Sequence, residues 1–425
     1  MPGSVPTGWQ RVRLGEIADV GTGGTPARER AEYWRGDVPW MASGEIHQRR
    51  VCATAECITS LGLKNSNAKV YPAETVMVAM NGQGRTRGTT ALLGIEAACN
   101  QSLAAIRSDG RAEQRFLFHV LDQSYERLRN LTGDGRSGLN LELIRSFDLL
   151  LPPLPEQRAI AAVLDAIDDT IERTEAVIAA TEELRRALLH ELLTRGVPGM
   201  HLEWKHVPGL GTVPACWEVT TLGECLDRIE AGRSPLAESR PARPDEWGVL
   251  KVSSVSWGEF QPDENKALAP ATLPDHRFEV QPGDVILSRA NTPDLVGRAV
   301  LVGTTRPKLL LSDKTLRLIP DSGRIVREFL LLAISTPSSR AQISGSASGS
   351  SRSMFNVSQE ALRGVQIALP SLTEQAHVAE LITFASNRSN SSRGEADALR
   401  SVKAALADRL LSGRFRAHTR TEVPT

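Results

Sequence analysis

Four short stretches of the chain place arginine, asparagine or glutamine beside glycine, and such side chains are suited to hydrogen bonding with the edges of bases. Arginine can donate two parallel hydrogen bonds to guanine, and asparagine or glutamine can pair with adenine in the same way. The stretches are "MNGQGRTRGTT" from Met80, "TGDGRSGLN" from Thr132, "SRANTPD" from Ser288 and "GSSRSMFN" from Gly349. Solvated loop polarity explains any single residue equally well, whereas the sets favour DNA contact. The candidates are Asn81, Gln83, Arg85, Thr86, Arg87, Arg136, Asn140, Arg289, Asn291, Arg352 and Asn356.

Catalytic groups are harder to find than base-contacting ones. The stretch "GTGGTP" from Gly21 lacks the GK[ST] ending of a phosphate-binding loop and the third glycine of a dinucleotide turn, so it predicts a structural turn. Nuclease chemistry needs separated carboxylates and a lysine around a metal. "PDENK" from Pro262 crowds these residue types together, and we interpret it as a loop. No NPPY- or DPPY-like tetrapeptide and no glycine motif for a methyl donor occurs, so we expect a non-catalytic chain.

The other titratable groups favour structural interpretations. "DAIDD" from Asp165 falls on a predicted helix, as a solvated face or, alternatively, as a contact with another subunit. His201 and His206 are interpreted as exposed residues of a linker, without ligand partners. The five cysteines form no CxxC pair and have no histidine at a zinc-like spacing. We therefore expect reduced, mostly buried thiols and no metal site.

The length and charge of the chain limit its class. At 425 residues it predicts two or more domains, and its 24% of charged residues is typical of a globular protein. No apolar stretch is long enough to span a bilayer, so we expect a cytoplasmic protein without membrane contact. Fifty basic residues balance fifty acidic ones. This neutrality argues against strong, stand-alone DNA binding but allows base reading within a more basic assembly.

The chain contains an internal repeat. "GWQRVRLGEIADV" from Gly8 returns as "CWEVTTLGECLDRI" from Cys216, and "VYPAETVMVAM" from Val70 returns as "VQPGDVILSRA" from Val280. "LPPLPEQ" and "LPSLTEQ" align with Glu156 and Glu374 in register. Each copy is a mixed segment followed by a long segment free of proline. A duplication explains this pattern, with small insertions in surface loops.

The mixed segments predict mostly strands. Short apolar runs bounded by Gly, Pro or Asn include "ETVMVAM", "ALLGI" and "SLAAI" in the first copy and "DVILSRA", "RAVLVG" and "TLRLI" in the second. Helices are expected around Glu113–Arg129 and Arg327–Ser335. The fold class is therefore α+β, with a curled sheet and long polar loops in each copy.

The long segments predict helices that pair. Pro155 suits the first helical position, Glu156 suits the first turn, and Thr373 is a good N-cap for the second helix. Steps of four and three residues, typical of a coiled-coil seam, link apolar or small residues in the first helix, and the same register can be followed in the second. The first seam is Ile160, Leu164, Ile167, Ile171, Thr174, Ile178, Thr181, Leu188 and Leu192, broken at Arg185. The second is Val378, Ile382, Ala385, Ser389, Ser392, Ala396, Leu399, Lys403, Leu406 and Leu410, with a polar middle.

Pairing the two seams within one chain is the simplest solution. About 40 residues give a helix roughly 60 Å long, and the second mixed segment begins just beyond the first helix. We therefore expect an antiparallel pair that separates two similar domains, with a pseudo-twofold relation; a parallel pair would need a fully stretched linker. The predicted parts are domain 1 at 1–152, a spacer helix at 153–196, a linker at 197–213, domain 2 at 214–370, a second spacer helix at 371–413 and a flexible tail at 414–425.

At this point the sequence resembles a known family. The tandem layout, the block "GGTPARERAEYWRGDVPW" from Gly23 and the helix entry "LPPLPEQRAIAAVLDAIDD" from Leu151 are similar to the specificity subunits of type I restriction-modification systems. The resemblance covers nearly the whole chain. The second copy has "AGRSPLAESRPARPDEWGVLKV" from Ala231 in place of the first block.

The resemblance implies two target recognition domains that read the two parts of a bipartite, asymmetric site in double-stranded DNA. It also implies two adenine methyltransferase (modification) subunits and translocating restriction subunits as partners. S-adenosylmethionine, ATP and Mg²⁺ would then belong to those partners, and this chain would hold no cofactor. The rival hypotheses are a stand-alone DNA-processing enzyme, such as a divergent nuclease, and a coiled-coil scaffold that does not bind DNA.

Overall fold

The computed structural model describes residues 5–82, 84–132, 138–351 and 354–417. The chain divides into unit 1, residues 1–177 with 392–425, and unit 2, residues 178–391. Each unit combines sheets with helices and takes one part of each of two long helices, α6 (Leu154–Thr194) and α10 (Leu372–Leu411). None of the helices in the described residues is long and apolar enough to cross a membrane.

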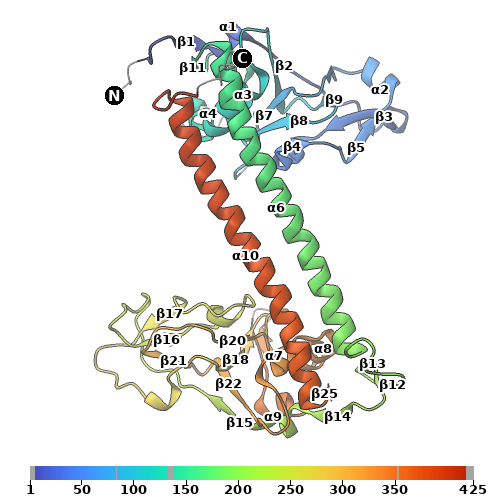
Figure 1. The fold of residues 1–425 in the computed structure, drawn as a ribbon, viewed down its shortest axis with the longest axis vertical. Coiled ribbons are helices and arrows are strands. Elements are labelled where there is room, and N and C mark those ends of the chain that lie inside the picture. The colour runs from blue at the N-terminus through green and yellow to red at the C-terminus, as the bar shows by residue number, and fades with distance from the viewer. Residues whose placement is uncertain (1–4, 83, 133–137, 352–353, 418–425) are drawn as a thin grey trace, which may run out of the picture. The chain divides into compact units, whose positions relative to one another are not determined.

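Unit 1 is built on a five-stranded sheet of order β2-β10-β7-β8-β4 and a four-stranded sheet of order β5-β3-β9-β6. In Figure 1 the five-stranded sheet lies between α6 and the smaller sheet. Every residue of β7 and β8 is buried, as expected for their continuous apolar runs. The elements are β1 (Gln10–Arg13), α1 (Leu14–Ile17), β2 (Ala18–Thr22), β3 (Trp34–Met41), β4 (Arg50–Val51), β5 (Glu56–Ile58), α2 (Ser60–Lys64), β6 (Val70–Tyr71), β7 (Val76–Ala79), β8 (Thr90–Leu93), β9 (Ala97–Cys99), β10 (Leu103–Ser108), α3 (Gln114–Gln123), α4 (Tyr125–Arg129), α5 (Leu141–Arg145) and β11 (Asp148–Leu151).

Unit 2 repeats this plan with a four-stranded sheet of order β15-β22-β18-β20 and a three-stranded sheet of order β17-β16-β21. Its elements are β12 (Trp204–Val207), β13 (Gly211–Pro214), β14 (Glu218–Thr221), β15 (Leu226–Ala231), β16 (Gly248–Leu250), β17 (Asn265–Ala267), β18 (Val285–Ser288), β19 (Ala290–Asn291), β20 (Ala299–Leu301), β21 (Leu309–Leu310), β22 (Thr315–Pro320), α7 (Arg327–Ser335), α8 (Pro337–Ser346), β23 (Ser348–Ser351), β24 (Met354–Asn356), α9 (Gln359–Arg363) and β25 (Gln366–Leu369).

The repeat extends to strand register. Ala104 of β10 lies opposite Thr22 of β2, and Leu316 of β22 lies opposite Ala231 of β15 in the same way. Helix α3 begins where the Glu113 carboxylate accepts a hydrogen bond from the Phe116 N–H at 2.6 Å, and α7 begins at the corresponding place in unit 2. The α+β class, the internal repeat and the expected strands and helices are confirmed.

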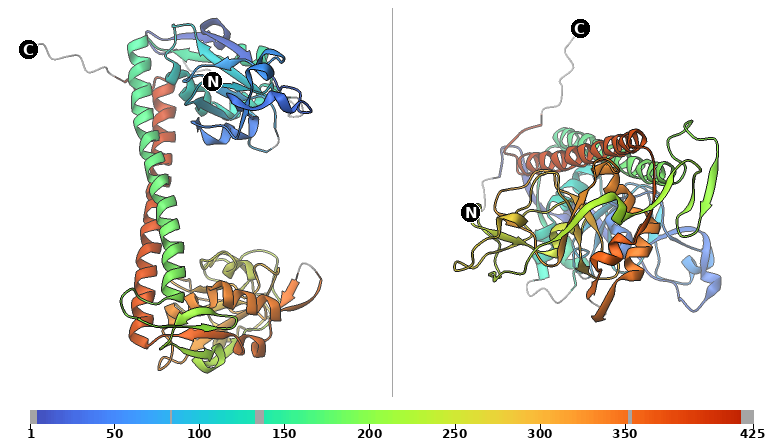
Figure 2. Two further views of the ribbon diagram at one scale, coloured as in Figure 1. Left: turned by 90° about the vertical axis from the view of Figure 1, so that its right-hand side faces the viewer. Right: turned by 90° about the horizontal axis from the view of Figure 1, so that it is seen from below.

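The two long helices pair in antiparallel fashion within each unit (Figure 2). In unit 1 Asp168 and Glu175 of α6 contact Lys403 and Arg400 of α10, so residue numbers rise along one helix and fall along the other. In unit 2 Ser389 donates a hydrogen bond of 2.7 Å to Glu182. The predicted seams face inward, since all of their described positions are buried or half-buried. The Ser389 hydroxyl in the polar middle of the second seam therefore has a hydrogen-bond acceptor on α6.

The motif "LP-x-L-x-EQ" attaches each domain to its long helix. Gln157 donates to the Pro152 carbonyl at 2.8 Å and accepts from the Glu113 N–H at 2.7 Å. Gln375 of unit 2 makes the same two contacts, with the Pro370 carbonyl at 2.9 Å and the Val326 N–H at 2.8 Å. Both glutamine side chains are buried, so the repeated motif joins the helix entry to the start of α3 or α7.

The glutamate that precedes this glutamine in each copy accepts a hydrogen bond from a tryptophan. Glu156 accepts a hydrogen bond from Trp9 Nε1 at 3.1 Å and pairs with Arg416 at 2.7 Å in unit 1. In unit 2 Glu374 accepts from Trp217 Nε1 at 3.0 Å. The recurrence of a tryptophan and a glutamate in both copies thus has one structural cause, a hydrogen bond between them. Arg416 lies in the segment 414–425, which was predicted to be a flexible tail. That prediction is wrong for residues 414–416. Arg414 and Arg416 form ion pairs, and the Phe415 N–H donates a hydrogen bond to the Arg409 carbonyl.

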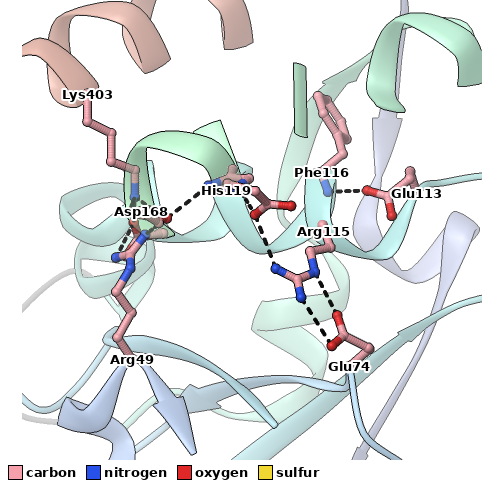
Figure 3. A network of polar contacts seen from close by, with 10 residues as sticks. Arg49, Glu74, Glu113, Arg115, Phe116, His119, Asp168 and Lys403 are labelled. Atoms are coloured by element: carbon pink, nitrogen blue, oxygen red, sulfur yellow. Dashed lines mark hydrogen bonds and ion pairs between the residues drawn. The ribbon is translucent and has the colours of Figure 1, made fainter. Parts of the chain in front are cut away.

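The prediction of a solvated face or subunit contact for "DAIDD" is wrong for two of its aspartates. Asp165 accepts a hydrogen bond of 2.9 Å from the buried His119, and Asp168 pairs with Arg49 at 2.8 Å and with Lys403 at 2.7 Å (Figure 3). These carboxylates join α6 to α3, to the strand region near β4 and to α10. Only long-range packing brings the cations to them.

The segment predicted as the linker 197–213 carries a two-stranded hairpin, because β12 and β13 pair within it. The prediction that His201 is an exposed residue is wrong. Its imidazole side chain is 6% exposed and contacts Glu374. The expectation of mostly buried cysteines is also only partly met, because Cys52 and Cys216 are exposed and Cys57 is half-buried.

Candidate nucleic-acid interface

Each unit has a cleft at the same place in the repeat. Cleft 1 has a volume of about 320 Å³ and is lined by Gly23, Gly24, Thr25, Ala27, Asn65, Ser66, Asn67 and Gln101. Cleft 2 has a volume of about 830 Å³, and its lining includes Ser234, Pro235, Lys251, Ser253, Lys266, Asn291, Asp313, Lys314 and Met354. Cleft 1 lies between the loop after β2 and the turn before β10, and cleft 2 lies between the loop after β15 and the turn before β22. In each unit these two strands pair with each other.

Close packing of glycine sets the position of this loop in both units. A Cβ atom on Gly23 would lie 1.9 Å from the Cys99 carbonyl oxygen, and one on Gly232 would lie 2.2 Å from the Leu311 carbonyl oxygen. No side chain fits at either position, so glycine is required there. The "GTGGTP" stretch is thus a close-packed turn, as predicted, and it also forms a wall of cleft 1.

The block "GGTPARERAEYWRGDVPW" holds that wall in place. Trp40 donates a hydrogen bond of 3.0 Å to the Gly24 carbonyl, and Trp34 donates one of 3.2 Å to the Ala27 carbonyl. The two indoles meet edge to face at 5.1 Å, and the Arg28 guanidinium lies 3.8 Å from the Trp34 ring centroid. The aromatic residues of this block therefore build the cleft and leave its polar lining to other side chains.

The two clefts present different chemistry. Cleft 1 carries three side-chain amides. The Thr25 hydroxyl donates a hydrogen bond of 2.6 Å to the side-chain oxygen Oε1 of Gln101, which leaves the NH₂ group of that amide as a donor. Cleft 2 carries three lysines, of which Lys251 pairs with Glu264 at 3.5 Å. Lys266 and Lys314 are exposed, and their ammonium groups have no partner among the described residues. Amides match the adenine edge, whereas lysine matches guanine or phosphate.

Sequence reasoning did not single out these amides and lysines, which lie in separate parts of the chain. The available signal was that "GGTP" from Gly23 and "GRSP" from Gly232 stand at corresponding places in the two copies, which indicates that the two clefts share one position in the repeat. It could not show which later residues complete each cleft.

The described candidates of unit 1 lie in the loop between β7 and β8 or, for Asn140, next to it. The Leu139 N–H donates to the Met80 carbonyl at 2.8 Å, so Asn81 and Asn140 lie on neighbouring segments. Asn140 caps α5 through a 2.9 Å hydrogen bond from the Leu143 N–H. Asn81 and Arg85 are exposed, and the guanidinium of Arg85 has no partner among the described residues.

Two other residues of this loop, Thr86 and Arg87, interact with other residues of the chain. The Thr86 hydroxyl lies 3.2 Å from His47 Nε2. Arg87 is half-buried and makes contacts of its own. The role of the loop in DNA contact stays a prediction, in which Asn81 and Arg85 are the side chains most available to a ligand.

In unit 2 the predicted residues that the structure describes, Arg289, Asn291 and Asn356, lie on or between the strands beside cleft 2. Asn356 of β24 pairs with Ala290 of β19, and the Val357 N–H donates to the Arg289 carbonyl at 3.0 Å. Asn291 lines the cleft, but its amide nitrogen donates to the Ser256 and Ser288 hydroxyls at 3.0 and 3.3 Å. The Arg289 guanidinium has no partner in the part of the chain that the structure describes.

Three predicted residues, Gln83, Arg136 and Arg352, lie outside the described residues. "PDENK" is not wholly a loop, because Asn265 begins β17 and is buried, with hydrogen bonds to Ala242 and Pro262. Among the described residues no group of three or more His, Cys, Asp or Glu side chains could hold a metal ion.

Residues 6–183 match a family model described as the type I restriction modification DNA specificity domain. The EcoEI specificity subunit of a type I restriction enzyme from Escherichia coli is 36% identical over 171 residues, which is 40% of this chain and 29% of that subunit. The MjaVIII specificity subunit from Methanocaldococcus jannaschii is 23% identical over 424 residues, 97% of this chain and 94% of the relative.

Two solved structures share the fold. The S subunit of a type I restriction-modification system from M. genitalium has a TM-score of 0.61 at 14% identity, over 95% of this chain and 96% of that one. A chain from a study of complex assembly and conformational transition in the type I system has a TM-score of 0.54 at 20% identity, over 97% of this chain and 100% of that one.

Proposed function

Because residues 6–183 match the type I restriction modification DNA specificity domain and the second unit repeats the plan of the first, we propose that the chain is a specificity subunit and that each of its two domains reads one part of a split DNA target. The observation that carries the proposal is the pair of clefts, which occupy equivalent positions in the repeat but have unlike linings. Equivalent positions favour the same task in both domains. Unlike linings favour different bases, and hence an asymmetric target.

The clefts supply the donors that base reading requires. Gln101, Asn65 and Asn67 offer amides in cleft 1, and Lys266 and Lys314 offer ammonium groups in cleft 2. Arg289, which precedes the cleft 2 residue Asn291, and Arg85 in the loop between β7 and β8 add guanidinium groups without partners among the described residues. One good two-point contact discriminates between bases by about 1–3 kcal/mol.

The chemistry of modification and cleavage is assigned to partners. We expect two methyltransferase subunits and restriction subunits to dock on this chain in the cytoplasm, and to bring S-adenosylmethionine, ATP and Mg²⁺ with them. The chain itself reads DNA and positions the partners without catalysing a reaction. Its net charge of zero supports this division, since a partner must then supply much of the phosphate contact.

The test is to map methylated adenines in the DNA of cells that make the chain with its modification subunit. Wild type is expected to give one bipartite motif. Gln101→Ala is expected to relax the base preference in one half of that motif and Lys314→Ala in the other half. Arg107→Ala is the matched control. Arg107 is exposed on β10, the strand that follows the Gln101 turn, and it does not line cleft 1. Changes in the same half from both cleft variants would contradict the proposal.

A further inference from the structure

Away from both clefts, unit 2 brings a cysteine, a histidine and a buried glutamate into contact. Cys216 Sγ lies 3.4 Å from His201 Nδ1, and His201 Nε2 lies 2.6 Å from Glu374 Oε1. The side chains of His201 and Glu374 are 6% and 4% exposed, whereas Cys216 is exposed to solvent. A nucleophile, a base within hydrogen-bonding reach and a third group that orients the base are the parts of an activated thiol.

The hydrogen bonds of Glu374 determine which imidazole nitrogen carries the proton. Its carboxylate also accepts hydrogen bonds from Trp217 Nε1 at 3.0 Å and from the Val197 N–H at 3.2 Å. A carboxylate that accepts from these donors also accepts from the Nε2–H of His201. The Nδ1 lone pair of a neutral imidazole then faces the thiol, so the thiol donates its proton to Nδ1.

A lysine binds the backbone on both sides of Cys216. The Lys205 ammonium donates to the carbonyls of Ala215 and Trp217 at 3.0 and 2.6 Å, and these residues flank Cys216 in the chain. A cation near a cysteine favours the charge that develops on sulfur during attack. The groups that contact the imidazole are therefore the Cys216 thiol, Glu374 from α10 and the Trp217 ring, which meets it edge to face at 6.0 Å. Lys205 from β12 contributes a positive charge at the backbone that flanks Cys216.

Unit 1 shows that the tryptophan–glutamate contact does not need these two residues. Glu156 takes Arg416 as its second donor, where Glu374 takes His201. Gly8 precedes Trp9, where Cys216 precedes Trp217. The structural contact is therefore complete with arginine and glycine, and the cysteine and histidine of unit 2 are an addition to it.

We propose that Cys216, His201 and Glu374 form an activated-thiol site that reacts with hydrogen peroxide. The sulfur attacks one peroxide oxygen as His201 Nδ1 takes the thiol proton, and the O–O bond breaks. The departing hydroxide takes the proton from the imidazolium and leaves as water. The sulfur is oxidised to a sulfenic acid, the peroxide is reduced to water, and the His201 imidazole returns to its neutral form. This proposal does not rest on the proposed DNA function.

The experiment compares cysteines within one full-length chain. Iodoacetamide at pH 6.5, followed by peptide mass spectrometry, gives the alkylation rate of each thiol. Cys52 is the matched reference, because it is exposed and has no hydrogen-bond partner among the described residues. Burial raises the pKa of the Cys99 thiol to about 12, so Cys99 serves as the unreactive standard. Cys216 is expected to react at least about tenfold faster than Cys52.

Two variants separate activation from folding. His201→Gln keeps a side-chain N–H donor for Glu374 but carries neither a base nor a charge, so it is expected to keep the thermal unfolding midpoint and to lower the Cys216 rate to that of Cys52. Cys216→Ser identifies the labelled peptide. With dilute hydrogen peroxide, dimedone is expected to label Cys216 in wild type and not in His201→Gln. Equal rates for Cys216 and Cys52, an unchanged rate in His201→Gln, or no dimedone label in wild type would each overturn the proposal.

Discussion

At the scale of single residues, His119 shows how unit 1 ties its domain to the long helices. The imidazole is buried, donates a hydrogen bond of 2.9 Å to Asp165 through Nε2, and has its Nδ1 atom 4.0 Å from Asp168. Burial alone would raise the pKa of Asp165, but the hydrogen bond with His119 and the charges of His119 and Arg115 hold that pKa below its ordinary value. The folded chain therefore favours the charged carboxylate.

This shift predicts a pH dependence of stability. A carboxyl group whose folded pKa is lowered stabilises the fold fully above its unfolded value of about 3.9, and the contribution is lost as pH falls through the folded pKa. Urea unfolding is expected to show the largest difference between wild type and Asp165→Asn above about pH 5, shrinking toward pH 3. Asp169→Asn, an exposed change on the same helix, is the control. A difference that grows as pH falls would contradict the assignment.

At the scale of elements, stability depends on how each domain meets its long helix. Ile160 and Leu164 of α6 join one core with Ala407 and Leu410 of α10, and unit 2 builds the same contact around Leu192, Val378 and Ile382. The apolar seams supply the attraction between the helices. The paired glutamines, Gln157 and Gln375, then set the angle at which each domain joins, because their hydrogen bonds are directional and buried.

Gln157→Ala tests this attachment. It leaves the Glu113 N–H and the Pro152 carbonyl without the partner that the structure records. The free energy of unfolding is expected to fall by about 1–3 kcal/mol, the cost of leaving buried polar groups unpaired. Arg158→Ala is the matched control, one residue further on the exposed face, and is expected to change stability by less than about 0.5 kcal/mol. Equal losses in the two variants, measured by urea unfolding, would rule out the attachment role.

At the scale of the whole molecule, two domains of one plan carry different polar surfaces on a chain without net charge. Affinity for DNA comes largely from phosphate neutralisation, whereas specificity comes from base contacts. A neutral chain with two differently lined clefts is thus better equipped to discriminate than to bind tightly. This balance suits a subunit that works inside a larger assembly.

The corresponding prediction concerns the chain alone and with its modification subunit. By fluorescence anisotropy at roughly 150 mM salt, the chain alone is expected to prefer its mapped target over a scrambled duplex by less than about tenfold. With the modification subunit the ratio is expected to reach at least about 10³. Tight specific binding by the chain alone, at a wide range of salt concentrations, would contradict the division of labour between the subunits.

The sequence by itself determined the repeat, the two long helices, their inward seams and most strands of both sheets. These features depend on local spacing and on turns such as the one at Gly23, which are visible along the chain. The predicted N-cap Thr373 is wrong, because α10 begins at Leu372 and the Ser371 hydroxyl accepts from the Glu374 N–H. Only the tertiary structure decided that Asp168 meets Arg49 and Lys403, that His201 is buried against Glu374, and that Gln101 shares a cleft with Asn65 and Asn67. Such partners lie far apart in sequence, and no local period encodes which of many charged or amide side chains the packing will bring together.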